Sequence, residues 1–391
     1  MSAPRLLAGP DPSKGPERFG AHAGRLGPLP KGGPALIDLL IRTELTGRGG
    51  ADFPVGVKWR AVAAASRGSS VVVANGAEGE PHSRKDRWLM TSRPHLILDG
   101  ALLAASTVQA KQVVLYIGEG HHAALRSMTE AVAERADHER RLIRIATAPA
   151  RYVAGESSAT VHLVDAGIAT PTTTPPAARE RGVGGAPTLV QNVETLAHVA
   201  LIARTGTATG TVLVTVAGAV RSPGVFEVAM GTPLSEAVHL AGGPSEPARA
   251  ILLGGYFGRW VEAAEAWPMP IDPNGLRARG LSLGCGVIGV LPARQCPVCE
   301  VAGIMRYLAS ESSAQCGPCF FGLRALADAC TRIAERGTDA GDLQRLKRWS
   351  GEVQGRGACK HPDGAVMFLQ SALKTFGDDF AHHPAHMRRS A

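Results

Sequence analysis

Residues 70–81 read SVVVANGAEGEP, and this stretch decides the fold class of the chain. Its first part, 70–74, is a short apolar run of β-branched residues, which is typical of a strand buried on both faces of a sheet. Turn-forming residues follow at once, beginning with Asn75 and Gly76. Further patterns alternate after it: a helix at 95–109, a strand at 112–117, a helix at 122–136 and a strand at 142–146. This alternation predicts an α/β fold with an open parallel sheet.

The chain changes character twice after this sheet. A loop at 182–187 leads into a helix at 193–203, and then two strands (212–217 and 224–229), a helix (234–241) and a strand (250–253) suggest a small mixed unit. From Cys299 onward apolar residues recur at helical spacing, which predicts a helical bundle. We therefore predict five parts: a flexible N-terminal arm (1–33), an α/β domain (34–205), a mixed domain with a connector (206–298), a helical domain (299–380) and a tail (381–391).

Composition narrows the class of protein. The 391 residues are 45% hydrophobic and 19% charged, which is typical of a globular protein. No apolar run is long enough to span a membrane, and the N-terminus lacks a secretory signal, so we expect a cytoplasmic location and no membrane span. The net charge of +8 could suggest nucleic acid, but the basic residues are scattered and aromatic residues are only 5%. Nucleic-acid binding is therefore not expected.

A glycine-rich loop precedes the first strand. Residues 47–58 read GRGGADFPVGVK, in which glycines let the backbone approach a phosphate or a flat ring, and Arg48 and Lys58 supply positive charge. The spacing matches neither a Walker A loop nor a dinucleotide fingerprint, and by itself the loop reads equally well as a surface turn. However, polar segments at 75–81 and 152–158 follow predicted strands, where open α/β sheets place ligands. A third, at 185–195, lies at a helix start.

Together, these segments resemble the motifs of the flavoprotein subunits of respiratory complex I, a family shared with NAD-reducing hydrogenases and formate dehydrogenases. The resemblance covers roughly residues 34–385. It implies that FMN binds to the α/β domain, and that residues 206–260 form a soluble-ligand-binding β-grasp unit serving mainly as structure. The positions that match the family's cofactor contacts are Gly47, Arg48, Gly49, Phe53, Lys58, Asn75, Glu78, Glu80, Gly155, Glu156, Asn192 and Thr195. Among them, Glu80 matches a glutamate that faces the nicotinamide cofactor.

Four positions depart from the family pattern. The aspartate of the family's Asn-Ala-Asp-Glu segment is Ala77 here, and the second glutamate of its Gly-Glu-Glu segment is Ser157. The family's Lys-Pro-Pro-Phe segment begins with Thr174 and ends with Ala177, so a cation and an aromatic ring are missing. These changes predict intact FMN binding and weak NAD(H) binding.

The seven cysteines all lie from Cys285 onward, which indicates metal or redox chemistry. The resemblance implies a [4Fe–4S] cluster on Cys316, Cys319 and Cys359, with Ser313 in the position of the family's first cysteine. The fourth ligand could be Ser313, a water, Cys296 or Cys299, and loss of one iron would give a [3Fe–4S] form.

A zinc site is the competing interpretation of the cysteines. The spacing Cys296-x2-Cys299-x16-Cys316-x2-Cys319 fits four zinc ligands, although residues 301–310 look helical and a zinc ribbon would place hairpins there. Cys285 and Cys330 read as ordinary buried cysteines. His361, near Cys359, reads as a surface or supporting residue.

The resulting hypothesis is an electron-transfer flavoprotein subunit, an NADH dehydrogenase-like or diaphorase-type oxidoreductase in which FMN passes single electrons to an iron–sulfur cluster. Its partner would be a ferredoxin-like or other iron–sulfur protein, or a larger redox complex. Two alternatives stay open: an FMN and iron–sulfur adaptor without NADH activity, and a non-catalytic scaffold with a structural zinc site.

Overall fold

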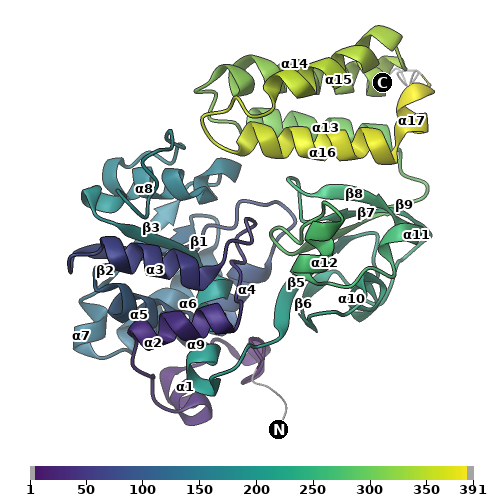
Figure 1. Ribbon diagram of the computed structural model, residues 1–391. Helices are drawn as coiled ribbons and strands as arrows, with labels where there is room; N and C mark the ends of the chain where they lie inside the picture. The colour runs from purple at the N-terminus through teal and green to yellow at the C-terminus, as the bar shows by residue number, and fades with distance from the viewer. Residues whose placement is uncertain (1–4, 385–391) are drawn as a thin grey trace. The chain divides into compact units, whose positions relative to one another are not determined.

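The computed structural model describes residues 5–384, and the chain divides into two compact units (Figure 1). One unit comprises Met1–Val214 with Glu227–Met230, and the other comprises Thr215–Phe226 with Gly231–Ala391. The predicted α/β domain lies in the first unit. The predicted helical domain and most of the predicted mixed domain lie together in the second, so the boundary at 298/299 stays a prediction.

The first unit is built on a four-stranded parallel sheet. Its strands are β1 (Ser70–Gly76), β2 (Ala110–Gly118), β3 (Ile143–Ala148) and β4 (Thr188–Asn192), in the order β3-β2-β1-β4. The open parallel sheet is therefore confirmed. Strand β4 was missed, because its five residues follow a glycine- and proline-rich stretch and read as the end of a loop.

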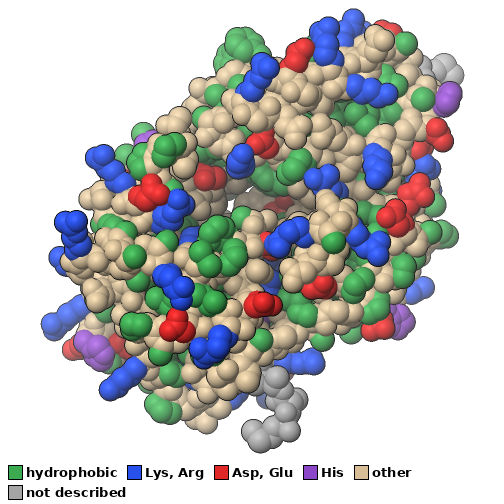
Figure 2. All heavy atoms as spheres, in the orientation of Figure 1, with side chains coloured by type: hydrophobic (Ala, Val, Ile, Leu, Met, Phe, Trp, Pro, Cys, Tyr) green, Lys and Arg blue, Asp and Glu red, His purple; other side chains and the backbone are tan. Residues whose placement is uncertain are grey.

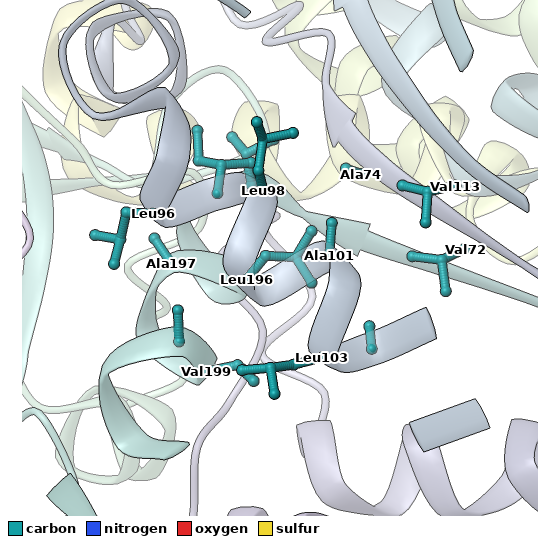
Figure 3. Close-up of a cluster of buried hydrophobic side chains, with 14 of the residues drawn as sticks. Val72, Ala74, Leu96, Leu98, Ala101, Leu103, Val113, Leu196, Ala197 and Val199 are labelled. Carbon is teal, nitrogen blue, oxygen red and sulfur yellow. The ribbon is translucent and has the colours of Figure 1, made fainter. Parts of the chain in front are cut away.

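Helices cover both faces of this sheet. They are α2 (Pro34–Arg42), α3 (Val55–Ala65), α4 (Lys85–Ser92), α5 (Pro94–Val108), α6 (His122–Ala133), α7 (Asp137–Arg140), α8 (Ser157–Ala166) and α9 (Val193–Thr205). Alternate strand residues point to opposite faces. Val72 and Ala74 pack with residues of α5 and α9 such as Leu98 and Leu196 (Figure 3), whereas Val73 packs in a second cluster with residues of α8.

Helices α5 and α9 approach each other closely. A side chain at Gly100 would lie 2.0 Å from the carbonyl oxygen of Leu196, so α5 needs a glycine where it meets α9. This contact holds the start of α9 against the sheet, close to the end of β4.

The N-terminal segment is not a flexible arm over residues 5–33. It contains a short 3-10 helix (Pro12–Lys14) and α1 (Phe19–Leu26). The guanidinium of the buried Arg93 donates hydrogen bonds to the carbonyls of Leu7, Ala8 and Pro10. His22 contacts Asp99 at 2.8 Å, and both side chains are buried. The prediction was wrong because glycine and proline content gives no information about buried partners elsewhere in the chain.

A second, mixed sheet has most of its residues in the second unit. Its strands are β5 (Thr211–Gly218), β6 (Gly224–Ala229), β7 (Ala248–Leu253), β8 (Arg259–Glu262) and β9 (Val287–Pro292), in the order β6-β5-β9-β7-β8. Strand β9 runs parallel to β5 and antiparallel to β7. The accompanying helices are α10 (Leu234–Leu240), α11 (Ala263–Ala266) and α12 (Pro273–Ala278).

The helical bundle follows, as predicted. It consists of α13 (Pro297–Ser310), a π-helical turn (Pro318–Leu323), α14 (Arg324–Arg336), α15 (Ala340–Val353), α16 (His361–Thr375) and α17 (Gly377–Ala381). On α14, the residues spaced for one helix face, Leu326, Cys330 and Ile333, are fully buried. No helix within residues 5–384 has the length and apolar character needed to cross a membrane.

Charged side chains are interspersed on the face shown in Figure 2. Blue and red side chains alternate there without a continuous basic patch.

Candidate functional site

The sheet has a topological switch point between β1 and β4. From β1 the chain continues to β2 and β3 on one side, and it later returns to form β4 on the other side of β1. Ligands of open α/β sheets bind at such a point, outside the carboxyl ends of the strands. Asn75 and Asn192 are register partners at the carboxyl ends of these two strands.

Two asparagines organise this edge of the sheet. Asn192 caps α9, because its Oδ1 accepts hydrogen bonds from the backbone N–H groups of Glu194 (3.0 Å) and Thr195 (3.4 Å). Asn75 Nδ2 donates to the carbonyl of Gly155 at 2.9 Å. The structure therefore brings together Asn75, Gly155, Asn192 and Thr195, which the sequence predicted from separate motifs.

The glycine-rich loop is fastened to the same place. The backbone N–H of Arg48 donates to Thr195 Oγ1 at 2.8 Å, and the N–H of Gly47 donates to the carbonyl of Phe53 at 2.9 Å. A side chain at Gly49 would lie 3.3 Å from Cβ of Asn192. Because this space is so narrow, the loop backbone itself lies against the start of α9.

Two cations, Arg48 and Lys58, belong to the loop segment itself. Arg48 is buried, burial lowers its pKa, and its Nε has no hydrogen-bond partner among the described residues. Lys58 Nζ donates to the carbonyl of Val190 at 2.5 Å, and its pKa is lowered to about 8 by burial first and then by Arg179. Arg179 was missed, although it follows the altered Lys-Pro-Pro-Phe segment by two residues. Arg48 and Lys58 are desolvated cations that need an anion, and a phosphate group suits them. Arg179, by contrast, is exposed and paired with Glu180 at 2.9 Å.

Two predicted glutamates act as helix caps. Glu78 Oε1 accepts hydrogen bonds from Ser83 Oγ (2.7 Å) and the N–H of Asp86 (2.9 Å), and its Oε2 accepts from Arg87. Glu156 Oε2 accepts from the backbone at the start of α8. Their carboxylates are therefore occupied by the fold, and contacts to a cofactor would come from their backbone.

Glu80 has a different environment. It is buried, and its Oε2 accepts a hydrogen bond from the hydroxyl of Tyr152 at 3.1 Å. A side chain at the preceding Gly79 would lie 2.8 Å from the carbonyl oxygen of Tyr152, so the turn after β1 packs directly on the segment after β3. Glu80 thus remains at the edge of the sheet where the other candidate residues meet.

A buried charge cluster that the sequence did not indicate supports the site. Lys85 Nζ lies 2.7 Å from Asp86 Oδ1 and 2.8 Å from Glu194 Oε2, and all three side chains are buried. Burial raises the pKa of Asp86 to about 7, whereas Lys85 and His198 outweigh burial and lower the pKa of Glu194 to about 2. Asp86 Oδ2 also accepts from Asn192 Nδ2 at 2.7 Å, so the cluster fixes the asparagine. The only sequence feature that could have indicated this cluster is the adjacent pair Lys85 and Asp86, shortly after the turn that contains Glu78 and Glu80.

The four departures from the family pattern lie in surroundings that do not replace the missing groups. Ala77 is buried in the apolar cluster that contains Val73 and Val190. Ser157 is exposed at the start of α8, and Thr174 is exposed as well. Phe53 keeps half of its surface exposed beside the loop.

The second candidate site is in the helical bundle. Burial, followed by the thiols of Cys316 and Cys359, raises the pKa of Cys319 to about 12, so both of these thiols act electrostatically on Cys319. Ser312, rather than Ser313, forms a hydrogen bond with Cys319. His361 is buried and its Nε2 donates to the carbonyl of Leu308 at 2.8 Å, so it supports the fold and is not on the surface.

Cys296 and Cys299 lie far from these thiols. Cys296 caps the first turn of α13, whereas Ser313 and Cys316 follow the last turn of the same helix. A helix of 14 residues spans roughly 20 Å. The four-cysteine zinc site and the use of Cys296 or Cys299 as a cluster ligand are therefore both wrong, because a rigid helix keeps the two cysteine pairs apart.

Comparison with known proteins places both sites in one family. The Nuo51 FMN-binding domain model matches residues 41–201, the SLBB domain model matches 213–255, and the NADH-ubiquinone oxidoreductase-F iron-sulfur binding region matches 300–383. An F-type subunit of NADH-quinone oxidoreductase in Rhizobium meliloti is 31% identical over 374 residues, covering 89% of this chain and 88% of the relative. The chain belongs to the family of NADH-quinone oxidoreductase F-type subunits.

Other relatives agree with this assignment. The F-type subunit of NADH-quinone oxidoreductase in Rickettsia bellii is 28% identical over 376 residues, covering 90% of both chains. The structure is similar to an NAD+-reducing [NiFe]-hydrogenase in its H2-reduced state, with a TM-score of 0.80 and 28% identity over 88% of this chain. This chain spans 62% of the length of that hydrogenase chain.

The matched family models indicate that the chain binds FMN and an iron–sulfur cluster, and its residues fit both cofactors. The unpartnered Nε of Arg48 and the narrow approach at Gly49 suit the phosphate and ring of FMN. Three gathered thiols with neighbouring serines suit an iron–sulfur cluster. The chain is therefore an electron-transfer flavoprotein subunit with FMN and an iron–sulfur cluster, and the non-catalytic scaffold is not favoured.

Replacing Lys58 with methionine should weaken FMN binding about 10- to 100-fold, because a charge-assisted contact to phosphate is worth about 1.5–3 kcal/mol. Fluorescence titration of the flavin-free protein measures this change. Arg60→Met is the matched control, since Arg60 lies on the same helix, exposed and paired with Asp38 at 2.9 Å. Equal FMN affinity in the two variants would remove Lys58 from the site.

Replacing Ser313 with cysteine should increase the retention of the cluster in air, because a thiolate binds iron more tightly than a hydroxyl or water does. Iron per chain after aerobic gel filtration measures the effect. Ser310→Cys adds a thiol at the exposed end of α13 and should change nothing. The same iron loss in wild type and Ser313→Cys would exclude this position as the fourth ligand.

Proposed function

We propose that FMN binds at the carboxyl ends of β1 and β4, with its phosphate held by the glycine-rich loop. Bound FMN accepts two electrons as a hydride and releases them singly, which is the chemistry that an iron–sulfur cluster can accept. The observation that supports this placement most directly is the buried Arg48, whose Nε lacks a partner in the described part of the chain. Lys58, at the end of the same loop segment, adds positive charge.

The protein groups in this proposal bind and orient the flavin. Thr195 and Asn192 hold the loop backbone and the start of α9 in place, so that the glycine-rich loop lies at the carboxyl ends of β1 and β4. Asn75 ties the end of β1 to the segment that contains Gly155 and Glu156. Glu80, held by Tyr152, is the residue that we assign to the nicotinamide side of the site.

We infer that the cluster is held by Cys316, Cys319 and Cys359, with an oxygen donor at or near Ser313 in the fourth position. The side chain of Cys319 is buried, and the thiols of Cys316 and Cys359 both raise its pKa, which supports this assignment. Ser312 contributes a hydrogen bond to Cys319, and hydrogen bonds to ligand sulfurs tune the potential of such clusters.

We propose that the electrons pass to an iron–sulfur protein, of ferredoxin type or as a neighbouring component of a larger redox complex. The support comes from the relatives, which are subunits of NADH-quinone oxidoreductase, and from the hydrogenase to which this fold is similar. A cytoplasmic location fits the absence of disulfides among the seven cysteines, all of which lie in the described range.

NADH oxidation is expected to be slow compared with family members that keep the complete cofactor groove. Three polar or charged contacts and one ring are missing, and at about 1 kcal/mol each their loss lowers kcat/KM by at least 100-fold. Anaerobic purification, followed by absorption and EPR spectra before and after NADH and then dithionite, tests the proposal. Cluster reduction by dithionite alone would support an adaptor that takes electrons from a protein.

Restoring one of the four missing side chains provides a control for the prediction of slow NADH oxidation. Ser157→Glu places a carboxylate at the exposed first turn of α8, where the helix dipole tolerates it, and should raise kcat/KM for NADH several-fold. A micromolar KM with a turnover of tens per second in the wild type would show that the departures do not matter. Absence of bound flavin and iron from the anaerobic protein would refute the proposed function itself.

A further inference from the structure

A second group of metal-binding side chains lies at the opposite end of α13 from the cluster motif. Cys296 Sγ lies 3.1 Å from His383 Nε2, and Cys299 Sγ lies 4.0 Å from the same nitrogen. The three donor atoms all lie within 4.8 Å of one another. We propose that Cys296, Cys299 and His383 bind a zinc ion separate from the iron–sulfur site.

The donor distances suit a tetrahedral ion. Zinc–sulfur bonds of about 2.3 Å and zinc–nitrogen bonds of about 2.0 Å place sulfur and nitrogen roughly 3.5 Å apart. The two observed distances lie on either side of this value, so the side chains need to shift by only about half an ångström. Two thiolates and an imidazole are a donor set that zinc prefers, and the fourth position is then available to water.

The two cysteines are preorganised by the start of a helix. Cys296 is the N-cap residue of α13, and its sulfur accepts a hydrogen bond from the backbone N–H of Cys299 at 3.3 Å. Pro297, which follows, fixes the first turn. Both sulfurs therefore lie at the first turn of α13, where the helix backbone fixes them next to each other.

His383 is held independently from the other side. Its backbone N–H donates to Thr338 Oγ1 at 3.1 Å, and the N–H of Thr338 donates to the carbonyl of His383 at 3.0 Å. The hydroxyl of Thr338 in turn donates to the carbonyl of Phe380 at 2.7 Å. The segment after α17 is thus clamped to the turn before α15, and this brings the buried imidazole to the first turn of α13.

The ion would join two ends of the bundle. Cys296 and His383 are 87 positions apart in the sequence, so a bond through zinc closes nearly the whole helical domain into a loop. Binding that exists only in the folded chain stabilises the fold directly. The zinc is therefore structural, and the redox cluster at the other end of α13 does not depend on its ligands.

Metal analysis of the full-length protein, purified anaerobically with its cofactors, tests this site. Plasma mass spectrometry should find about one zinc per chain in the wild type, and below about one tenth in Cys296→Ser, Cys299→Ser and His383→Ala. Iron and flavin content should stay unchanged in all three. His382→Ala and Cys285→Ser are matched controls that should keep the zinc. X-ray absorption at the zinc edge should show two sulfur ligands and one nitrogen ligand.

A second measurement covers the case in which a variant fails to fold. Wild-type protein treated with a zinc chelator should lose about 5–10 °C in its thermal midpoint. Added Co2+ should restore the midpoint and give a thiolate-to-cobalt absorption band in the near ultraviolet. A zinc-free wild type from zinc-supplemented cells, or zinc retained in all three variants, would overturn the proposal. Loss of iron in the two cysteine variants would also overturn it, by assigning these thiols to an iron centre.

Discussion

Cys359→Ser is expected to leave the protein with less than one iron per chain, against about four in a complete cluster. Iron–sulfur clusters are held by four ligands, usually thiolates. Since Ser313 already stands in place of one cysteine, the change leaves only Cys316 and Cys319. Two thiolates cannot hold the cluster, so the EPR signal of the dithionite-reduced protein should disappear together with the iron.

The FMN content of Cys359→Ser should show that the substitution affects only the cluster. FMN content is expected to remain at the wild-type level, because the candidate flavin residues lie in the other compact unit. Cys285→Ser alters a thiol that donates a hydrogen bond to the carbonyl of Gly254 at 3.3 Å, and this variant should keep both cofactors. A fully assembled cluster in Cys359→Ser would mean that the ligand set has been assigned wrongly.

Lys85→Met is expected to lower the free energy of unfolding of the first unit by about 3–5 kcal/mol. The ammonium lies between the buried carboxylates of Asp86 and Glu194 at 2.7 and 2.8 Å. Without it, two negative charges remain buried with no counter-charge between them, and Asp86 loses its fixed position against Asn192. Urea unfolding measures the loss of stability, and flavin titration measures the accompanying loss of affinity.

Two further variants test whether the lost stability of Lys85→Met comes from the unpaired buried carboxylates or from changed side-chain packing. Lys111→Met alters an exposed lysine on β2 and should change stability by less than about 0.5 kcal/mol. Lys85→Met combined with Glu194→Gln removes one of the stranded charges and should recover part of the stability. If Lys85→Met alone cost less than about 1 kcal/mol, the cluster would not be the support of the site that the distances indicate.

The motifs could be recognised from the sequence because each one is contained within a few neighbouring residues. The valine run before Asn75, the glycines around Arg48 and the Cys316–Cys319 pair each carry their chemistry within a few residues. The same holds for the helical spacing on α14. Local patterns of this kind were sufficient for the parallel sheet, the helical bundle and the family.

Side-chain roles were less predictable. Glu78 and Glu156 match cofactor motifs, yet their carboxylates cap α4 and α8. A residue type at a given spacing does not specify which backbone groups will meet it, and capping competes with ligand binding for the same oxygen atoms. Lys85 was not singled out, because nothing in the nearby sequence indicates that it will contact Glu194.

The sequence by itself determined the α/β sheet and the helical bundle that carries the cysteines, because both depend on short-range periodicity and residue type. The two cofactors followed from the resemblance of its motifs to a known family. Only the tertiary structure decided which distant groups meet. Arg48 and Thr195 are 147 positions apart, and Cys296 and His383 are 87 apart. Hydrogen bonds and ion pairs between such segments form after the chain has packed, so they leave no local pattern from which they could be predicted.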